Sequence, residues 1–380
     1  QSFVKYTTME RFWQQGISIQ SRESFVDENV KAMHTLRDFA DSVGHIIRYT
    51  REYSYLMIGT ITELEETLYV DPKNASLLWK ALTEESVGIT LHSWRHMINL
   101  VVRNVIKNCP MDYFDLFMLG FLPQVFIKLD ELLLQRWNRV YEKGLRLEGN
   151  ESDEQLSEEM LEEHMLRQLT QVIDRMLIDI AGQKVRTSLT DRQKETREFL
   201  IYNFEVLAPF LKLLCDIISF RDTRCSFNAI LILRHISQEL VGLNDERVDK
   251  IILENIMPIL IDLICDKFYT DAHSEAAYTL SILYIGERFK SDYPLQLLKN
   301  KLGVNQETMA NFENVFSACQ KSRERKNCLL TLFNNARNDG NPDAYIEQRN
   351  KMIQGATRAK KKNTVDGLEG GLGGLFNTDD

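Results

Sequence analysis

Proline and glycine, the two residues that most often interrupt helices, are scarce in this sequence of 380 residues, with seven and eighteen copies. Most of them lie between helix-like segments or near the C-terminal end. Strict alternation of apolar and polar residues, the pattern of a half-buried strand, hardly occurs between Phe3 and Phe333. These two absences point away from a β-sheet protein and toward a chain made of helices.

Closely spaced cysteine pairs and an excess of basic residues are also missing. The six cysteines include no C-x-x-C pair, and most lie in apolar helical surroundings, where a free thiol behaves as a small hydrophobic group. We therefore expect reduced thiols in the cytosol or nucleus. The net charge of −9 argues against a surface that follows nucleic-acid phosphates as a whole, although a local basic face remains open.

The sequence offers no membrane span and no secretory signal peptide. The most apolar stretch, from Phe199 to Phe220, contains two acidic residues, a lysine and a proline, and the stretch from Leu116 to Ile127 is too short to cross a bilayer. The chain begins at Gln1 without a methionine, and we expect further residues before it.

Motifs for catalysis or cofactor binding are missing from the helical part of the chain. It has no G-x-S-x-G, P-loop or dinucleotide fingerprint. His92 and His96 are four positions apart, a spacing that can place two imidazoles on one metal ion, but Ser93 occupies the place of a metalloprotease glutamate and no third ligand is evident. We therefore expect no catalytic, cofactor-binding or metal-binding residues, and no enzyme activity.

What the sequence does contain is one hydrophobic period of about 3.6 residues, repeated in segments of roughly twenty residues. Residues 156–180 show it clearly, with apolar positions at Leu161, Met165, Leu169, Val172, Met176 and Ile180. Amphipathic helices need neighbours to cover their apolar faces. The pattern predicts an all-α fold, an α-solenoid or right-handed superhelix of HEAT- or armadillo-like antiparallel helix pairs, with roughly fourteen helices in repeats of about 40–47 residues.

The order of these segments predicts four regions. We expect helical repeats over residues 1–147, an acidic loop over 148–157, further repeats over 158–336 and a partly flexible tail over 337–380. Within the second set, Asp222, Asp245 and Asp271 each precede an apolar-periodic run and are expected to cap a helix. Residues 148–163 hold eight acidic residues and no basic one, which is typical of a solvated loop entering a helix or of a contact surface for a basic partner.

A short basic segment lies near the end of the predicted repeats. Arginine binds phosphate through two parallel hydrogen bonds and lysine supplies a point charge, so this segment is a candidate contact for RNA backbone or a phosphorylated peptide. The alternative is a capping face that keeps the open end of the solenoid soluble. The candidate residues are Lys321, Arg323, Arg325 and Lys326.

The acidic break that leads into residues 157–170 resembles the C-terminal part of the exportin-5 class of karyopherin-β receptors, in the importin-β superfamily. The basic helix around residues 321–326 agrees with this resemblance, as do the closing Gly373-Gly374-Leu375-Phe376 segment and Trp137 in the apolar-basic stretch 132–141. Members of the class are much longer, so the chain is similar to their C-terminal region alone. The fungal branch, which exports phosphorylated proteins, is favoured.

The resemblance implies a nuclear transport receptor that binds cargo together with Ran-GTP and shuttles between nucleus and cytoplasm through the pore. It implies phosphoprotein cargo, structured RNA such as tRNA, and nucleoporins with Phe-Gly repeats as partners. Ran contacts in the family concentrate in N-terminal repeats, so no Ran-binding residue is carried over to this chain. The alternative, from a different class, is a HEAT-repeat scaffold subunit of a stable multiprotein complex.

Overall fold

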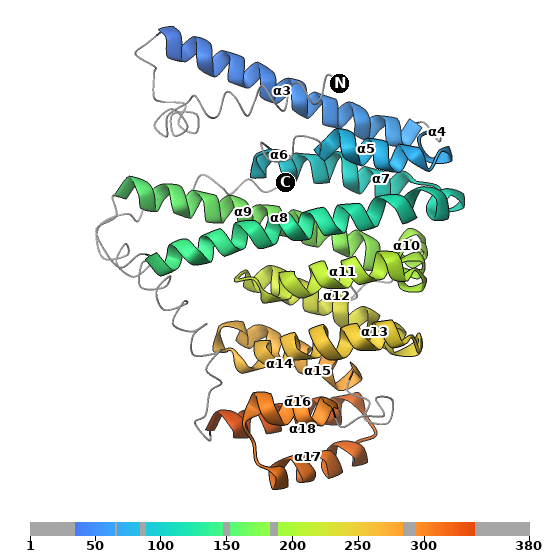
Figure 1. Ribbon diagram of the computed structural model, residues 1–380, viewed down its shortest axis with the longest axis vertical. Coiled ribbons are helices and arrows are strands. Elements are labelled where there is room, and N and C mark those ends of the chain that lie inside the picture. Colours follow the sequence, from blue (N-terminus) through green and yellow to red (C-terminus); the bar gives the residue numbers. More distant parts are fainter. Residues whose placement is uncertain are drawn as a thin grey trace.

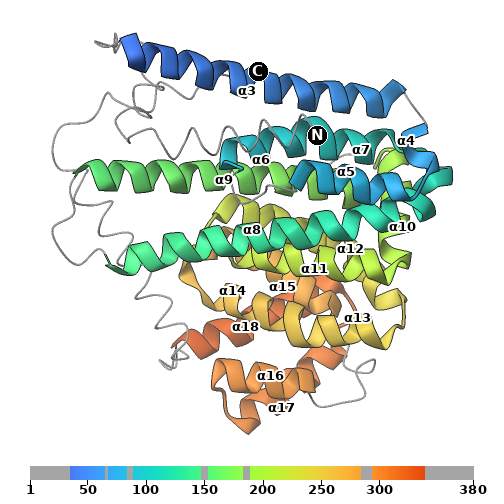
Figure 2. The same ribbon diagram turned by 45° about the horizontal axis from the view of Figure 1, so that its top comes forward.

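The computed structural model describes residues 35–64, 67–83, 89–146, 153–182, 189–283 and 293–338. Every regular element within these ranges is a helix, and the helices lie side by side in an elongated stack (Figure 1). α3 lies at one end of the stack, and α17 and α18 lie near the other (Figures 1 and 2). The predicted all-α solenoid of antiparallel helix pairs is confirmed.

The α-helices of the described residues are α3 (Thr35–Leu64), α4 (Thr67–Val70), α5 (Lys73–Thr83), α6 (Leu91–Met97), α7 (Arg103–Asn108), α8 (Leu119–Arg146), α9 (Asp153–Ala181), α10 (Asp191–Tyr202), α11 (Phe204–Ser219), α12 (Thr223–Gly242), α13 (Glu246–Ile251), α14 (Met257–Cys265), α15 (His273–Leu283), α16 (Tyr293–Leu302), α17 (Gln306–Ala318) and α18 (Ser322–Asn338). Short 3-10 or π segments join some of them, namely η2 (Ile98–Val102), η3 (Met111–Tyr113), η4 (Phe114–Met118), η5 (Ile252–Ile256) and η6 (Lys267–Ala272).

The helices form two rows that run along the stack. In one row α5 packs on α8, α8 on α11, α11 on α14 and α14 on α16. In the other row α3 packs on α6 and α7, which pack on α9, and the row continues through α12 and α15 to α18. The rows meet where α8 contacts α9, α11 contacts α12 and α14 contacts α15. Each interior helix is therefore covered on several sides, which explains why its apolar positions are buried.

Local side-chain caps fix several of the helix starts. Asp222 accepts hydrogen bonds from two free amides at the start of α12, and Asp245 accepts one at the start of α13. Both predicted caps are confirmed. The prediction for Asp271 is wrong, because this residue lies inside the 3-10 segment η6 rather than immediately before α15.

Three helical segments of the described residues contain a π-helical turn. η2 joins α6 to α7, η4 precedes α8, and η5 joins α13 to α14. Pro258 lies two residues after the end of η5, in the first turn of α14. Proline lacks an amide hydrogen and clashes with the carbonyl four residues before it, so a local change of the hydrogen-bond ladder helps a helix to accommodate it. The π turn η5 supplies that change just before Pro258.

The predicted acidic loop is shorter than the sequence suggests. α9 begins at Asp153, inside the range 148–157 that was expected to be a loop. Acidic side chains are favourable at a helix N-terminus because they face the positive end of the helix dipole, so the charged run starts the helix instead of delaying it. At the other end α18 continues to Asn338. Residues 147–152 and the remainder of the predicted tail, 339–380, lie outside the described residues.

Aromatic and arginine side chains fasten neighbouring layers. The rings of Phe126 on α8 and Phe210 on α11 meet edge to face with centroids 5.5 Å apart. Arg192 of α10 donates hydrogen bonds to the carbonyls of Ile106, at 2.6 Å, and Cys109, at 2.5 Å, which closes the C-terminal end of α7. None of the described helices is long and apolar enough to cross a lipid bilayer.

Candidate functional site

The four basic residues singled out from the sequence, called the basic cluster below, lie where α17 turns into α18. Lys321 immediately precedes α18, and Arg323, Arg325 and Lys326 lie in its first turns. Lys321 and Arg323 are exposed, whereas Arg325 and Lys326 are half-buried. The four basic residues therefore lie together at the last layer of the described stack, with the exposed Glu324 between Arg323 and Arg325.

Two members of the basic cluster take part in the fold itself. The Nε of Arg325 donates a hydrogen bond to the carbonyl oxygen of Cys319 at 3.0 Å, and its guanidinium lies 5.8 Å from the ring centroid of Phe316. The Nζ of Lys326 donates to the Oγ of Ser274 at 3.3 Å and so connects α18 to α15. Both side chains therefore hold α18 in place.

Helix geometry divides the basic cluster into two faces. Arg323 and Arg325 are two positions apart, so their side chains leave α18 on roughly opposite sides. Arg323 and Lys326 are three positions apart and share a side. A single phosphate cannot contact Arg323 and Arg325 together, and the structure offers the exposed pair Lys321 and Arg323 as the more accessible contacts.

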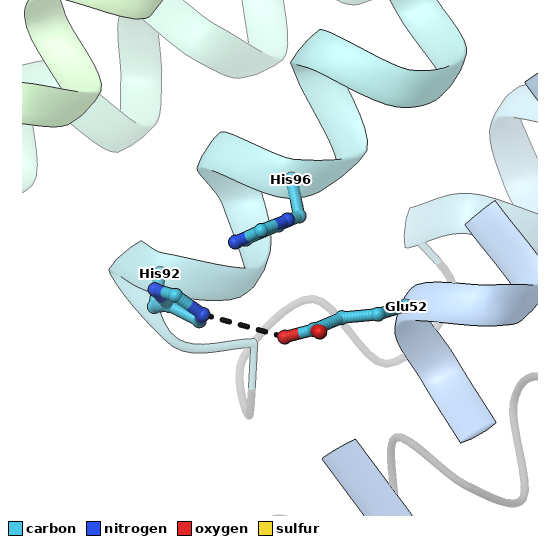
Figure 3. A group of neighbouring side chains, drawn as sticks. All are labelled: Glu52, His92 and His96. Carbon is cyan, nitrogen blue, oxygen red and sulfur yellow. Dashed lines mark ion pairs between the residues drawn. The ribbon is translucent and has the colours of Figure 1, made fainter. Parts of the chain in front are cut away.

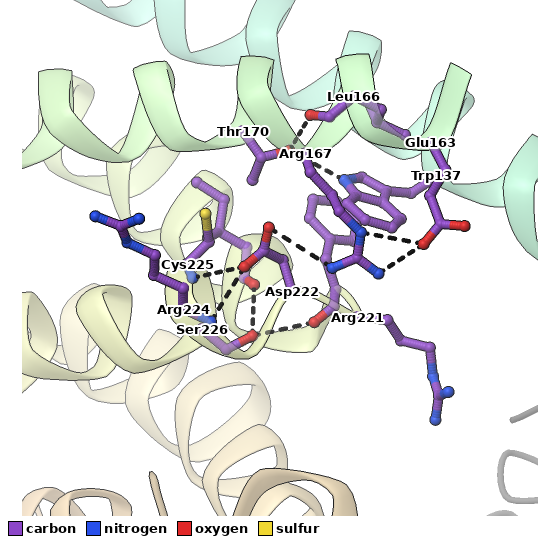
Figure 4. A network of polar contacts seen from close by, with 12 residues as sticks. Trp137, Glu163, Leu166, Arg167, Thr170, Arg221, Asp222, Arg224, Cys225 and Ser226 are labelled. Carbon is purple, nitrogen blue, oxygen red and sulfur yellow. Dashed lines mark hydrogen bonds and ion pairs between the residues drawn. The ribbon is translucent and has the colours of Figure 1, made fainter. Parts of the chain in front are cut away.

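The residues 157–170 that carry the family resemblance lie on α9, which meets α8 and α12 at this point (Figure 4). The indole of Trp137 donates a hydrogen bond to Thr170 at 3.2 Å and stacks on Phe220 with centroids 5.5 Å apart. Arg167 bonds Glu163 at 2.6 Å, and its guanidinium lies 3.8 Å from the carboxylate of Asp222. The side chains of this segment therefore have a structural role, because they connect α8, α9 and α12.

Two acidic groups of the same interior, the buried Asp174 and the half-buried Asp216, have raised pKa values. Burial raises the pKa of Asp174 to about 7, against a hydrogen bond from Asn228 that lowers it. Burial and the neighbouring Asp130 carboxyl together raise the pKa of Asp216 to about 7. Lys212 forms an ion pair with Asp130 across the boundary of α8 and α11. These groups lie between helices, and we find no feature that marks them as general acids.

Glu52 of α3 meets His92 and His96 of α6, as Figure 3 shows. One ligand atom from each lies within 4.8 Å of the others. Burial lowers the pKa of His92 to about 4 and also lowers that of His96. Glu52 is thus a potential third ligand that the sequence did not associate with the two histidines. Glu52 is forty positions before His92, and only the crossing of α3 over α6 brings it there.

A sequence model of the exportin-5 family matches residues 1–349, which is most of the chain. The chain belongs to the exportin-5 family. The match places the chain among the exportins, as the resemblance in residues 157–170 predicts, and the helical stack agrees with the solenoid expected of a karyopherin.

Fungal relatives resemble this exportin-family chain over most of its length. Protein MSN5 of Saccharomyces cerevisiae is 35% identical over 96% of the chain, which corresponds to 31% of MSN5. An uncharacterised protein of Schizosaccharomyces pombe is 27% identical over 88% of the chain and 29% of its own length. Protein HASTY 1 of Arabidopsis thaliana is 24% identical over 46% of the chain and 14% of its own length.

These values favour the fungal branch, as expected from the sequence. The exportin-family chain spans about a third of the length of the two fungal relatives. No solved structure matches the chain.

Proposed function

We propose that this chain is part of a nuclear export receptor that binds cargo together with Ran in its GTP form and carries it through the nuclear pore to the cytoplasm. The match of the exportin-5 family to residues 1–349 is the observation that carries this proposal. The proposal assigns the chain a role in binding and none in catalysis. Its partners are Ran-GTP, cargo and nucleoporins with Phe-Gly repeats, and the receptor shuttles between nucleus and cytoplasm.

A stack of helix pairs suits this role for a physical reason. Bending is shared among many layer interfaces, so each interface deforms little when the whole stack changes curvature. Two ligands that favour the same curvature assist each other, typically by about 1–3 kcal/mol. Loss of Ran-GTP would then weaken cargo binding by roughly 5–150-fold and release the cargo.

The Ran part of the proposal is tested with the full-length receptor, because the family resemblance implies that Ran contacts concentrate in more N-terminal repeats. We expect Ran locked in its GTP form to be captured by the receptor, and cargo to raise the amount captured. A stable multiprotein scaffold would capture its subunits equally with and without Ran-GTP. That result would replace the export receptor by the scaffold interpretation.

For cargo, we propose phosphorylated proteins in the first place and structured RNA such as tRNA in the second. The basic cluster, Lys321, Arg323, Arg325 and Lys326, is the proposed phosphate contact. Its exposed members carry the charge that an incoming phosphate meets first, while Arg325 and Lys326 hold α18 against its neighbours.

A charge reversal that spares the fold separates the two roles of the basic cluster. We expect the double substitution Lys321→Glu and Arg323→Glu to weaken binding of a phosphorylated cargo peptide by about tenfold, because two charge-assisted contacts are lost. Fluorescence anisotropy with phosphorylated and unphosphorylated forms of one peptide measures the effect. Double-stranded RNA in the same assay, over a salt series, distinguishes RNA cargo from protein cargo.

The matched control is the double substitution Lys73→Glu and Lys80→Glu, which makes the same charge change at exposed positions of α5. It should leave both affinities unchanged. If Lys321→Glu with Arg323→Glu also leaves both unchanged, the basic cluster does not contact cargo and serves as the soluble end of the stack.

A further inference from the structure

Three side chains from two helices converge at the crossing of α3 and α6. His92 and His96 are one turn apart on α6, with ring centroids 4.4 Å apart, and Glu52 reaches them from α3. The Nε2 of His92 lies 3.4 Å from the Oε1 of Glu52. In Figure 3 the carboxylate of Glu52 points toward both rings. The exposed fraction of the side chain is 23% for Glu52 and 39% for His92, so solvent reaches the group.

These distances fit the edges of a tetrahedron around a metal ion. Zn²⁺ is bound by histidine nitrogen and carboxylate oxygen at about 2.0–2.2 Å, which places two ligand atoms of a tetrahedral site about 3.3 Å apart. The separation of 3.4 Å between Glu52 and His92 has that length without any movement. One ligand atom from each of the three residues already lies within 4.8 Å of the others. We expect a rotation of His96 about its side-chain bonds to complete the set.

We propose that Glu52, His92 and His96 bind one divalent transition-metal ion of the Zn²⁺ type. Imidazole and carboxylate together form a donor set that zinc accepts, and two histidines four apart on a helix present their nitrogens on the same side. The fourth position stays open for water. Because the ligands come from different helices, the metal ties α3 to α6 and stiffens the boundary between the first two described layers.

Neighbouring arginines limit the affinity of this site. The Nε of Arg48 lies 3.9 Å from Glu52, and Arg51 and Arg95 are near enough to act on the charge of His96. Their positive charges oppose a divalent cation, and Arg48 competes directly for the Glu52 carboxylate. Removal of the Arg48 charge is therefore expected to tighten metal binding at this site. The affinity of a metal ion bound elsewhere on the surface would not change.

The test uses the metal-free chain titrated with Zn²⁺ alone by calorimetry, and with Co²⁺ by visible absorption, whose d–d bands report the ligand geometry. We expect one ion per chain. The single substitutions Glu52→Gln, His92→Ala and His96→Ala should each weaken binding by about tenfold or more, since each removes one of three protein ligands. Arg48→Gln should tighten binding by roughly threefold to tenfold at low salt.

The matched controls substitute residues of the same types at positions away from the proposed metal site. Glu63→Gln alters an exposed carboxylate on the same helix, and His235→Ala removes a histidine from α12. Both should bind metal as the unchanged chain does. Hydrogen exchange gives a second readout, because Zn²⁺ should slow the exchange of α3 amides in the unchanged chain and not in Glu52→Gln. Equal metal affinity in all variants, or unaltered exchange in α3, would overturn the proposal.

Discussion

Asp174 illustrates how a single residue makes the stability of this fold depend on pH. It is only 2% exposed, and its Oδ2 accepts a hydrogen bond from Asn228 at 2.8 Å. Its Oδ1 is buried without a hydrogen-bond partner among the described residues. Burial raises the pKa of Asp174 to about 7. The unfolded chain, by contrast, releases this proton near pH 4.

The sign of the pH effect follows from this difference. Between about pH 4 and pH 7 the folded chain keeps a proton on Asp174 that the unfolded chain has lost, so stability falls as pH rises through this window. Asp174→Asn imitates the protonated form. We expect it to raise the free energy of unfolding by on the order of 2 kcal/mol at pH 8, relative to its effect at pH 4.5, in urea titrations.

The control for this prediction is Asp271→Asn, which removes the same charge at an exposed position. Its effect on stability should be the same at both pH values. An equal effect of Asp174→Asn at pH 4.5 and pH 8 would mean that Asp174 is ionised in the folded chain throughout, against the burial argument.

At the scale of helices, the close packing of α3 on the next layer depends on one glycine. A Cβ atom built on Gly59 would lie 2.1 Å from the carbonyl oxygen of Leu100, a backbone atom of η2 that cannot move aside alone. Glycine inside a helix costs roughly 0.5–1 kcal/mol relative to alanine. The close crossing of the two helices is the reason that this position tolerates it.

Two glycine-to-alanine substitutions should have opposite effects. Gly59→Ala is expected to destabilise the chain by about 1–3 kcal/mol, because α3 must move away from η2. Gly120→Ala, on α8, adds a Cβ that meets the Cβ of Ala75 at an ordinary 3.6 Å, so it should stabilise by about 0.5–1 kcal/mol. Thermal unfolding of the two variants measures the difference. Stabilisation by Gly59→Ala would show that the crossing is looser than described.

The helix boundaries that could be predicted from the sequence are those determined by residues close to them in the chain. Asp222 and Asp245 mark helix starts because a capping side chain acts within three residues of itself. Asp271 fails as a cap because η6 is fixed by a contact across it, in which a ring nitrogen of His273 lies 2.8 Å from the carbonyl oxygen of Asp266. Features created by the crossing of distant helices leave no local signal.

The candidate sites show the same limit. The position of the basic cluster was predictable from charge alone, but the tether of Arg325 to Cys319 was not, since it depends on how α17 meets α18. Glu52 could not be associated with His92 before the crossing of α3 and α6 was known. The helical class, in contrast, was predictable because each helix carries its own periodic apolar face.

At the scale of the whole molecule, the described helices form a stack in which each layer packs mainly on its neighbours, so we expect its stability to vary along its length. The central helix α11 buries most of its apolar side chains, whereas α17, near the end of the described stack, buries only Met309, Phe312 and Phe316. At the opposite end, α3 leaves a row of large apolar side chains exposed, which comprises Ile46, Tyr49, Tyr53, Leu56, Met57, Ile61 and Leu64.

Two core substitutions should therefore destabilise different numbers of layers. Phe312→Ala removes a ring that packs on Phe316 with centroids 5.3 Å apart, and we expect it to speed native-state hydrogen exchange in α16–α18 only. Leu214→Ala, at a fully buried position of α11, should speed exchange in the layers on both sides, because a cavity of this kind costs about 2–5 kcal/mol where every neighbour depends on it. If Phe312→Ala instead accelerates exchange equally from α3 to α18, the stack unfolds as one cooperative unit. That result would contradict the expectation that the stability of a layer depends mainly on its nearest neighbours in the stack.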